Sequence, residues 1–419
     1  MTHWPLSPPA MSFSFIHAAD LHLDSPLIGL SARDEHLGDA FAKASRQALD
    51  NLVDGAIAHR VAFVVISGDV YDGAWRDFST GRTFSRAAAR LAKADIPLFL
   101  IHGNHDAASA ISPRLKLPDQ TRVLSPNRPE PIDLAALGVA NHGQSFWQRV
   151  VNDNLAQNYP PPRPDRFNIG LLHTACEGRA GHDPYAPCTV EQLVNHGYQY
   201  WALGHVHRRE ILHSHPHVVF AGNLQGRHVR EIGPKGATLV RVAEGQVVGL
   251  TPLILDAARW AVVTVDAAAA QDLDELWSAV GNRLADATDA AEGRPLATRV
   301  VLHGATLLHD ALVRRGIAAL EAQCQSVAFE LSEALWVERL RLETCPLDVP
   351  VAGTLGDLAA AIDTAAKDDE PRQALARELN TLLTKLPPEL RGEFPADEAA
   401  LDELFGTARA LILARWQGE

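Results

Sequence analysis

Short apolar runs alternate with helix-like segments along the first half of the chain. The clearest run, residues 61–67, is continuous and rich in β-branched side chains, which predicts a strand buried on both faces. We predict strands at residues 13–19, 61–67, 97–101, 168–172, 198–203 and 218–221, and helices at 41–60 and 79–94. Strands that alternate with helices predict an α/β fold.

The pattern changes near Asp256. Strands predicted at 261–265, 298–303 and 336–342, with helices at 273–287 and 307–323, indicate a small α+β unit. Beyond Val349 the chain is rich in Ala, Leu and Glu, and we predict helices at 355–366, 372–386 and 397–416. We therefore expect four parts: a tail at 1–11, a first domain at 12–255, a cap at 256–348 and a helical segment at 349–419.

Residues 1–11 contain prolines and lack the basic start of a signal peptide. We expect them to form a flexible tail, or to lie upstream of a start near Met11. No apolar run approaches the roughly 20 residues that span a bilayer. We therefore expect a cytoplasmic protein without membrane contact.

Five of the predicted strands in the first domain end in loops that carry Asp, His or Asn. Ligands collect at strand ends in α/β sheets, so these side chains should converge. They are Asp20, His22, Asp69, Asn104, His105, His173, His205 and His207. Carboxylate, imidazole and amide donors together suit Mn, Fe, Zn or Co better than Ca or Mg alone. Five loops with satisfied histidines are the alternative, which the ordered combination argues against.

The same loops resemble those of a known family in their order along the chain and in their amino-acid sequence. Asp-x-His, Gly-Asp-x-x-Asp, Gly-Asn-His-Asp, a lone His and Gly-His-x-His resemble the calcineurin-like metallophosphoesterase superfamily. Its DNA repair exonuclease branch, the YhaO and SbcD-like nucleases, is similar in HAADLHLDSPL, SGDVYD, HGNHD, LGHVHRRE and AGNLQGRH. The match covers about residues 12–250. It implies a four-layer metallophosphoesterase β-sandwich flanked by helices, followed by a small α+β cap domain and a helical C-terminal segment.

The resemblance also implies a role for each site residue. Two divalent ions, manganese by preference, would share seven ligands: Asp20, His22 and His207 for one, Asn104, His173 and His205 for the other, and Asp69 as the bridge. His105 matches the catalytic histidine, and we expect Asp106 to orient it through a hydrogen bond. Asp72 stands where some relatives have a second functional histidine. SbcD-like proteins have Asp there, so we expect Asp72 to support the site from behind the ligands.

Several neighbouring residues allow two interpretations. Arg208 and Arg227 either contact substrate or are solvated surface side chains. Gly222–Gly226 forms either a phosphate contact or a tight turn. The apolar faces of the C-terminal helices either pack on the cap or dock a partner. The resemblance favours a partner, a coiled-coil ATPase of the SbcC or YhaN type, and a homodimer.

Net charge and chain length favour different functions among three candidates. The formal net charge of −13, from 38 basic and 51 acidic residues, argues against broad non-specific nucleic-acid binding. It favours a phosphoesterase acting on a nucleotide or other small phosphoester, whereas the long extension after Asp256 favours a DNA exonuclease or endonuclease in repair. A non-catalytic scaffold subunit is the third possibility, and the intact ligand set argues against it. The four cysteines form no C-x-x-C pair, which argues against a zinc site built on them.

Overall fold

The computed structural model describes residues 12–25, 35–72, 78–107, 116–178, 185–347, 354–385, 400–402 and 404–409. The tail predicted at 1–11 lies outside these ranges. The chain divides into two compact units, Met1–Trp260 and Ala261–Glu419, close to the boundary predicted after residue 255. Among the described residues, no helix is both long enough and apolar enough to span a membrane.

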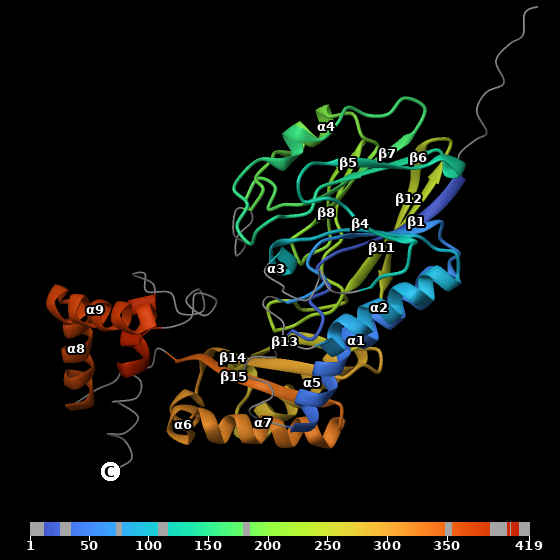
Figure 1. Cartoon of the computed structure of the whole chain (residues 1–419). Coiled ribbons are helices and arrows are strands. Elements are labelled where there is room, and N and C mark those ends of the chain that lie inside the picture. The colour runs from blue at the N-terminus through green and yellow to red at the C-terminus, as the bar shows by residue number, and fades with distance from the viewer. Residues whose placement is uncertain are drawn as a thin grey trace, which may run out of the picture. The chain divides into compact units, whose positions relative to one another are not determined.

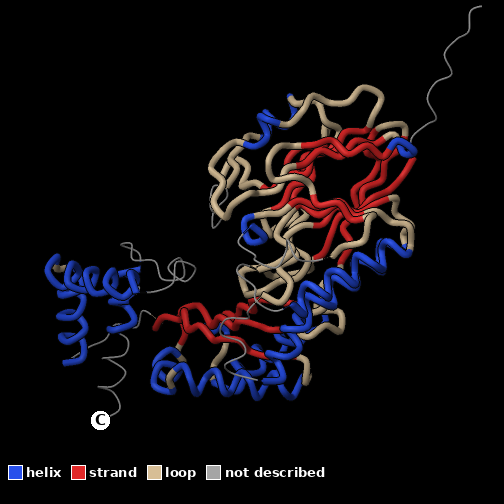
Figure 2. Tube along the Cα trace, viewed as in Figure 1, coloured by secondary structure: helices blue, strands red, loops and turns tan. Residues whose placement is uncertain are grey.

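The first unit contains two six-stranded sheets, seen as facing layers in Figures 1 and 2. The first sheet has the order β12-β11-β1-β2-β3-β4, with bounds Gln246–Ile254, Gly236–Ala243, Ser12–Ala18, Phe63–Ser67, Leu98–Ile101 and Thr121–Val123. The second has the order β5-β6-β7-β8-β10-β9, with bounds Glu130–Leu134, Val139–Gly143, Phe167–His173, Tyr200–Gly204, His217–Phe220 and Glu210–Ser214. The strands that precede the polar loops run parallel to one another in each sheet: β1, β2 and β3 in the first, and β7 and β8 in the second.

Alternation of side chains along the strands creates the layers. On β2, Phe63 and Val65 join the core between the two sheets, whereas Val64 and Ile66 join the core beneath the helices. That outer core includes residues of α1 (Glu35–Ala58) and α2 (Phe78–Lys93). On the second sheet, Trp201 packs outward in a cluster with Leu193 of α4 (Val190–Asn195). The predicted α/β class and the flanked sandwich are confirmed.

Short helical turns complete the first unit. They are α3 (Asn104–Ala107) and the 3-10 turns Ala135–Leu137 and Leu155–Asn158. α3 starts at a predicted ligand, because the polar loop after β3 turns directly into this helix.

The second unit begins with a three-stranded sheet of order β13-β14-β15, with bounds Arg259–Asp266, Leu296–Thr306 and Leu335–Pro346. Its helices are α5 (Leu273–Ala290), α6 (His309–Arg315) and α7 (Ile317–Leu331), and the 3-10 turn Ala267–Ala269 follows β13. Apolar side chains from these helices and strands form one buried cluster. The single helix predicted at 307–323 is wrong: the chain breaks at Gly316, whose φ of 75° lies outside the helical region.

Helices also make up the C-terminal segment. α8 (Thr354–Lys367) and α9 (Asp369–Lys385) match the helices predicted at 355–366 and 372–386. Residues 400–402 and 404–409 are helical, and the rest of the helix predicted at 397–416 lies outside the described residues. Arg372 Nη1 lies 2.7 Å from Asp402 Oδ1, so an ion pair connects α9 to the last helical residues.

Candidate metal centre

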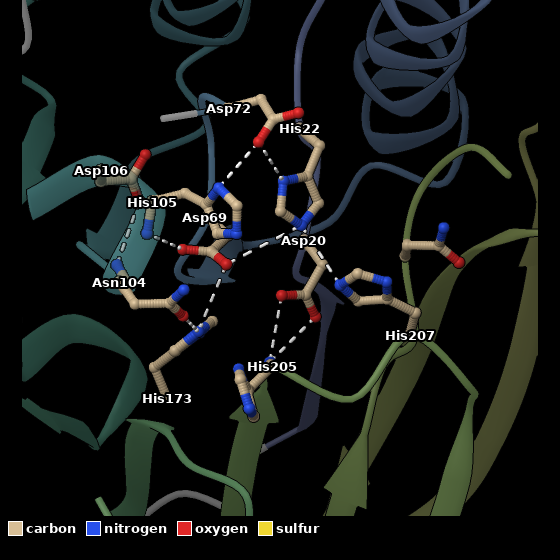
Figure 3. Close-up of polar contacts among 12 residues, drawn as sticks. Asp20, His22, Asp69, Asp72, Asn104, His105, Asp106, His173, His205 and His207 are labelled. Atoms are coloured by element: carbon tan, nitrogen blue, oxygen red, sulfur yellow. Dashed lines mark hydrogen bonds and ion pairs between the residues drawn. The ribbon is translucent and has the colours of Figure 1, made fainter. Parts of the chain in front are cut away.

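The polar loops after β1, β2, β3, β7 and β8 meet at one edge of the sandwich, as Figure 3 shows. Backbone hydrogen bonds hold the first two together: Asp20 N donates to Gly68 O over 3.0 Å, and His22 N donates to Asp69 O over 3.0 Å. His205 N donates to both carboxylate oxygens of Asp20 over 3.0 Å. Residues separated by 185 positions in sequence are therefore neighbours in the site.

One half of the site contains Asp20, His22 and His207. Each offers a ligand atom, and these atoms lie within 4.8 Å of one another. The Nε2 atoms of His22 and His207 are 3.2 Å apart. A carboxylate and two imidazole nitrogens that converge in this way fit a divalent transition-metal ion.

The other half contains His173, Asn104 and His205. His173 Nε2 lies 2.9 Å from Asn104 Oδ1, and the His173 and His205 ring centroids are 5.1 Å apart. The Asp69 carboxylate lies between the halves: its Oδ2 is 3.4 Å from His173 Nε2 and 3.7 Å from His22 Nε2. All seven predicted ligands therefore meet, with the predicted bridge at the centre.

The outer ring nitrogens fix how two of the histidines face the site. His173 Nδ1 donates to the Ser67 carbonyl over 2.9 Å, and His207 Nδ1 donates to Glu231 Oε1 over 2.6 Å. Because Nδ1 carries the proton of each hydrogen bond, Nε2 is the ring nitrogen that faces the interior and can bind an ion once it is deprotonated. Metal-binding histidines are held by such outer hydrogen bonds, so the residues present fit a metal centre.

The loop backbone is strained where the ligands are. Asp20, His22, Asp69 and His205 have φ values of 51°, 41°, 53° and 96°, in a region that residues other than glycine rarely adopt. Such strain persists where the surrounding structure holds it in place, and it is concentrated at functional sites. Four of the seven predicted ligands share this strain, which supports a functional interpretation over ordinary turns.

Gly103 explains why the third motif begins with glycine. A Cβ built on Gly103 would collide with the Asp69 carboxylate, and it would lie 2.8 Å from His173 Nε2. Glycine is therefore required for the close approach of this loop to the central carboxylate.

Burial and neighbouring charges shift the pKa values of the acids and histidines in the site. Burial raises the pKa of Asp20 to about 8, and the nearby charge of Asp69 adds to this. Although burial acts to lower the pKa of His173, the charge of Asp69 and its hydrogen bond raise it to about 9. Burial likewise opposes ionisation of Asp69, but the charge of His173 holds the Asp69 pKa well below its usual value. Metal ligands bind deprotonated, so a cation would displace the protons held on Asp20 and His173.

The structure corrects the role predicted for Asp106. Its carboxylate accepts hydrogen bonds from the backbone N–H groups of Val70, Tyr71 and Gly103, over 3.1, 2.9 and 3.0 Å. Asp106 thus joins the second and third loops. The prediction failed because sequence adjacency to His105 does not fix the direction of a side chain on the short helix α3.

His105 is instead oriented by Asp72. His105 Nδ1 lies 2.7 Å from Asp72 Oδ1, and Ser25 Oγ donates to Asp72 Oδ2 over 2.5 Å. Burial tends to lower the pKa of His105, but the hydrogen bond to Asp72 and the charge of Asp69 raise it overall. His105 can therefore hold a proton beside the metal centre.

The two predicted arginines differ. Arg208 is exposed. The side chain of Arg227 is 19% exposed and lies beside the site, with Nη1 3.9 Å from Asp72 Oδ2 and Nη2 3.2 Å from His207 Nδ1. Glu231, which contacts both His207 and Arg227, was not among the residues predicted from the sequence. Arg227 and Glu231 are four residues apart, and this spacing could have indicated that the two side chains form an ion pair.

Known protein families match two parts of the chain. Residues 13–209 match the model of the calcineurin-like phosphoesterase family, and residues 260–345 match the middle domain of the metallophosphoesterase YhaO. The YhaO metallophosphoesterase of Bacillus subtilis (strain 168) is 33% identical over 295 residues, which cover 70% of this chain and 72% of that protein.

More distant relatives are named as DNA double-strand break repair proteins. The DNA double-strand break repair protein Mre11 of Sulfurisphaera tokodaii is 24% identical over 266 residues, covering 60% of this chain and 65% of the relative. The Mre11 protein of Methanococcus maripaludis is 30% identical over 92 residues, covering 22% of this chain and 23% of the relative.

Proposed function

Because the chain belongs to the calcineurin-like metallophosphoesterases and carries a YhaO-type middle domain, we propose that it is a two-metal DNA exonuclease or endonuclease that acts in DNA repair. The family establishes a metal-dependent phosphoesterase. The choice of DNA, of manganese and of a partner is our proposal.

The observation that supports the proposal most strongly is the position of Asp69. Its Oδ2 is 3.7 Å from His22 Nε2 and 3.4 Å from His173 Nε2, so one carboxylate faces donors on both sides. Asp20, His22 and His207 would hold one ion, and Asn104, His173 and His205 the other. Two such ions supply Lewis acidity and an activated water for in-line attack on phosphorus.

Three residues of the chain would act on the substrate around this centre. His105, kept protonated by Asp72 at 2.7 Å, would donate a proton to the departing 3′ or 5′ oxygen. Arg227 would hold a non-bridging phosphate oxygen, since its guanidinium lies beside His207 and is part-exposed. Arg208, exposed next to the Gly-His-x-His loop, would contact a more distant backbone phosphate.

DNA is favoured as substrate by the similarity to the Mre11 repair proteins, which covers 60% of this chain in the first of them. The net charge of −13 favours a nucleotide or other small phosphoester instead. We prefer DNA because the matched middle domain, residues 260–345, extends the chain well beyond the catalytic unit.

A partner would explain the C-terminal helices. Leu382 of α9 and Leu404 of the last helical residues are 60% and 40% exposed. Exposed apolar side chains on helices suit a helical partner. We propose a coiled-coil ATPase of the SbcC or YhaN type, and a homodimer of the nuclease itself.

The test is cleavage of end-labelled single- and double-stranded DNA in Mn²⁺, Mg²⁺ or EDTA, with bis-p-nitrophenyl phosphate as a small diester. Asp69→Ala is compared with Asp286→Ala, an exposed acid of α5. Mn²⁺-dependent DNA degradation that disappears only in Asp69→Ala is expected. Hydrolysis of the small diester without action on DNA, even with the ATPase added, would contradict the nuclease proposal.

A further inference from the structure

One carboxylate outside the predicted ligand set collects several contacts at the edge of the metal centre. Glu231 is 6% exposed and lies in the loop between β10 and β11. Its Oε1 is 2.6 Å from His207 Nδ1 and 3.3 Å from Arg227 Nη2. Its Oε2 accepts from Asn223 Nδ2 and from the backbone N–H of Arg227, each over 2.8 Å.

We propose that Glu231 is a positioning residue that sets both the metal affinity of His207 and the substrate contact of Arg227. The proposal rests on the metal centre proposed above and deepens it, because it joins ion binding and phosphate binding in one side chain. Asn223, in the loop that begins Ala221-Gly222-Asn223, donates to this carboxylate and so helps to hold it in place.

His207 donates its Nδ1 proton to Glu231, and the direction of this hydrogen bond determines which ring nitrogen can bind an ion. A carboxylate that accepts the Nδ1–H fixes the tautomer and makes Nε2 a better ligand. That Nε2 lies 3.2 Å from His22 Nε2, inside the cluster that contains Asp20. A side chain that could not accept from Nδ1 would leave the ring free to turn and to change tautomer.

The guanidinium of Arg227 lies between two carboxylates. Nη2 contacts Glu231 Oε1 at 3.3 Å, whereas Nη1 faces Asp72 Oδ2 at 3.9 Å. Asp72 also orients His105, at 2.7 Å. Arg227 therefore spans the carboxylate behind His207 and the carboxylate behind His105. The Arg227 side chain is still 19% exposed, which leaves it accessible to a phosphate oxygen.

The first experiment measures Mn²⁺ binding to the full metal-free chain by isothermal titration calorimetry, a readout independent of hydrolysis. Glu231→Gln keeps the shape but loses the charge. We expect its dissociation constant for one of two ions to rise about 10- to 100-fold. Arg227→Gln should bind Mn²⁺ as the wild type does, because the hydrogen bond from His207 Nδ1 to Glu231 remains.

The second experiment measures KM and kcat for bis-p-nitrophenyl phosphate at saturating Mn²⁺. Both Glu231→Gln and Arg227→Gln should raise KM several-fold, since each weakens the hold on phosphate. Glu231→Asp should restore part of both effects, as it keeps the charge. Glu338→Gln is the matched control: Glu338 also pairs with an arginine, Arg299 at 3.1 Å, in the second unit, and its removal should change neither readout.

Wild-type Mn²⁺ affinity in a folded Glu231→Gln protein would overturn the proposal, as would an equal loss of Mn²⁺ affinity in Arg227→Gln. If Glu231→Gln does not fold, Glu231→Asp decides: weaker Mn²⁺ binding at an unchanged unfolding temperature supports the proposal, and wild-type binding overturns it. A wild-type chain that binds two Mn²⁺ but leaves DNA intact contradicts only the nuclease assignment, because the titration still tests Glu231.

Discussion

Both units of the chain bury apolar clusters, but the first unit also buries a group of acids and histidines. At one edge of its sandwich the first unit buries Asp20, Asp69, His173 and His205 on loops with unusual backbone angles. The second unit packs its sheet and helices through a cluster of apolar residues. Its buried Arg299 is matched by Glu338 at 3.1 Å.

The buried polar residues of the first unit serve chemistry, whereas the apolar cluster of the second unit serves stability. Burying polar groups in strained loops costs free energy, and a fold tolerates that cost where it serves function. An apolar cluster between helices and a sheet contributes stability without any demand on exact donor positions. The same kind of substitution should therefore damage activity in the first unit and change only stability in the second.

The largest expected effect is that of His105→Ala. Loss of a positioned general acid should lower kcat about 10²- to 10⁴-fold. Metal content should stay near the wild-type value, because His105 is held by Asp72 and is outside the seven ligands. Steady-state kinetics on DNA, together with metal analysis of the purified variant, checks this. Empty metal sites in the variant would show that His105 is a ligand and would remove its proposed role.

Gly103→Ala should have the next largest effect on activity. The added Cβ would collide with the Asp69 carboxylate and lie 2.8 Å from His173 Nε2, so the central ligands must move. We expect Mn²⁺ affinity and turnover both to fall at least about 10-fold, the range seen when metal ligands lose their support. Calorimetric titration and kinetics measure the two effects. An active variant with normal Mn²⁺ binding would show that the loop is less constrained than the geometry requires.

Asp72→Asn should change the pH dependence. Burial lowers the pKa of His105, and the hydrogen bond to Asp72 raises it, so removal of the charge should lower that pKa. His105 acts when protonated, and activity is lost as pH rises through its pKa. The alkaline limb of kcat on a DNA oligonucleotide should therefore shift to lower pH in the variant. An unchanged limb would mean that another group controls it.

The smallest effect is expected in the second unit. Gly281 lies within α5, and a Cβ there would meet Val327 at an ordinary contact of 3.5 Å. Alanine favours a helix interior over glycine by up to about 1 kcal/mol. Gly281→Ala should raise the unfolding temperature slightly, as thermal denaturation would show, and leave hydrolysis unchanged. A loss of activity equal to that of Gly103→Ala would break the contrast between the units.

The sequence predicted the ligand set because each ligand loop follows a buried apolar strand. The run at 61–67, for example, ends in Gly68-Asp69, and β2 ends at Ser67 in the structure. Local patterns of this kind determine where a strand stops. They also place the ligands on one edge, since strand ends of neighbouring strands lie together.

What the sequence left open depends on side-chain direction and on tertiary contacts. Asp106 is adjacent to His105 but accepts from the backbone of Tyr71, whereas Asp72 reaches His105 from another loop. Glu231 belongs to no ligand motif, and its role appears only when its loop folds against His207. The break of the helix at Gly316 was visible as a glycine, but the apolar periodicity on either side concealed it.

If Asp69 joins two ions, their unpaired electrons should be coupled, which can be measured. Metal-free protein is titrated with Mn²⁺ and followed by calorimetry and by electron paramagnetic resonance, beside Asp69→Ala. We predict two Mn²⁺ per chain with a spin-coupled signal in the wild type, and loss of the coupling in Asp69→Ala. Binding of a single Mn²⁺, or two ions without coupling in the wild type, would contradict the account.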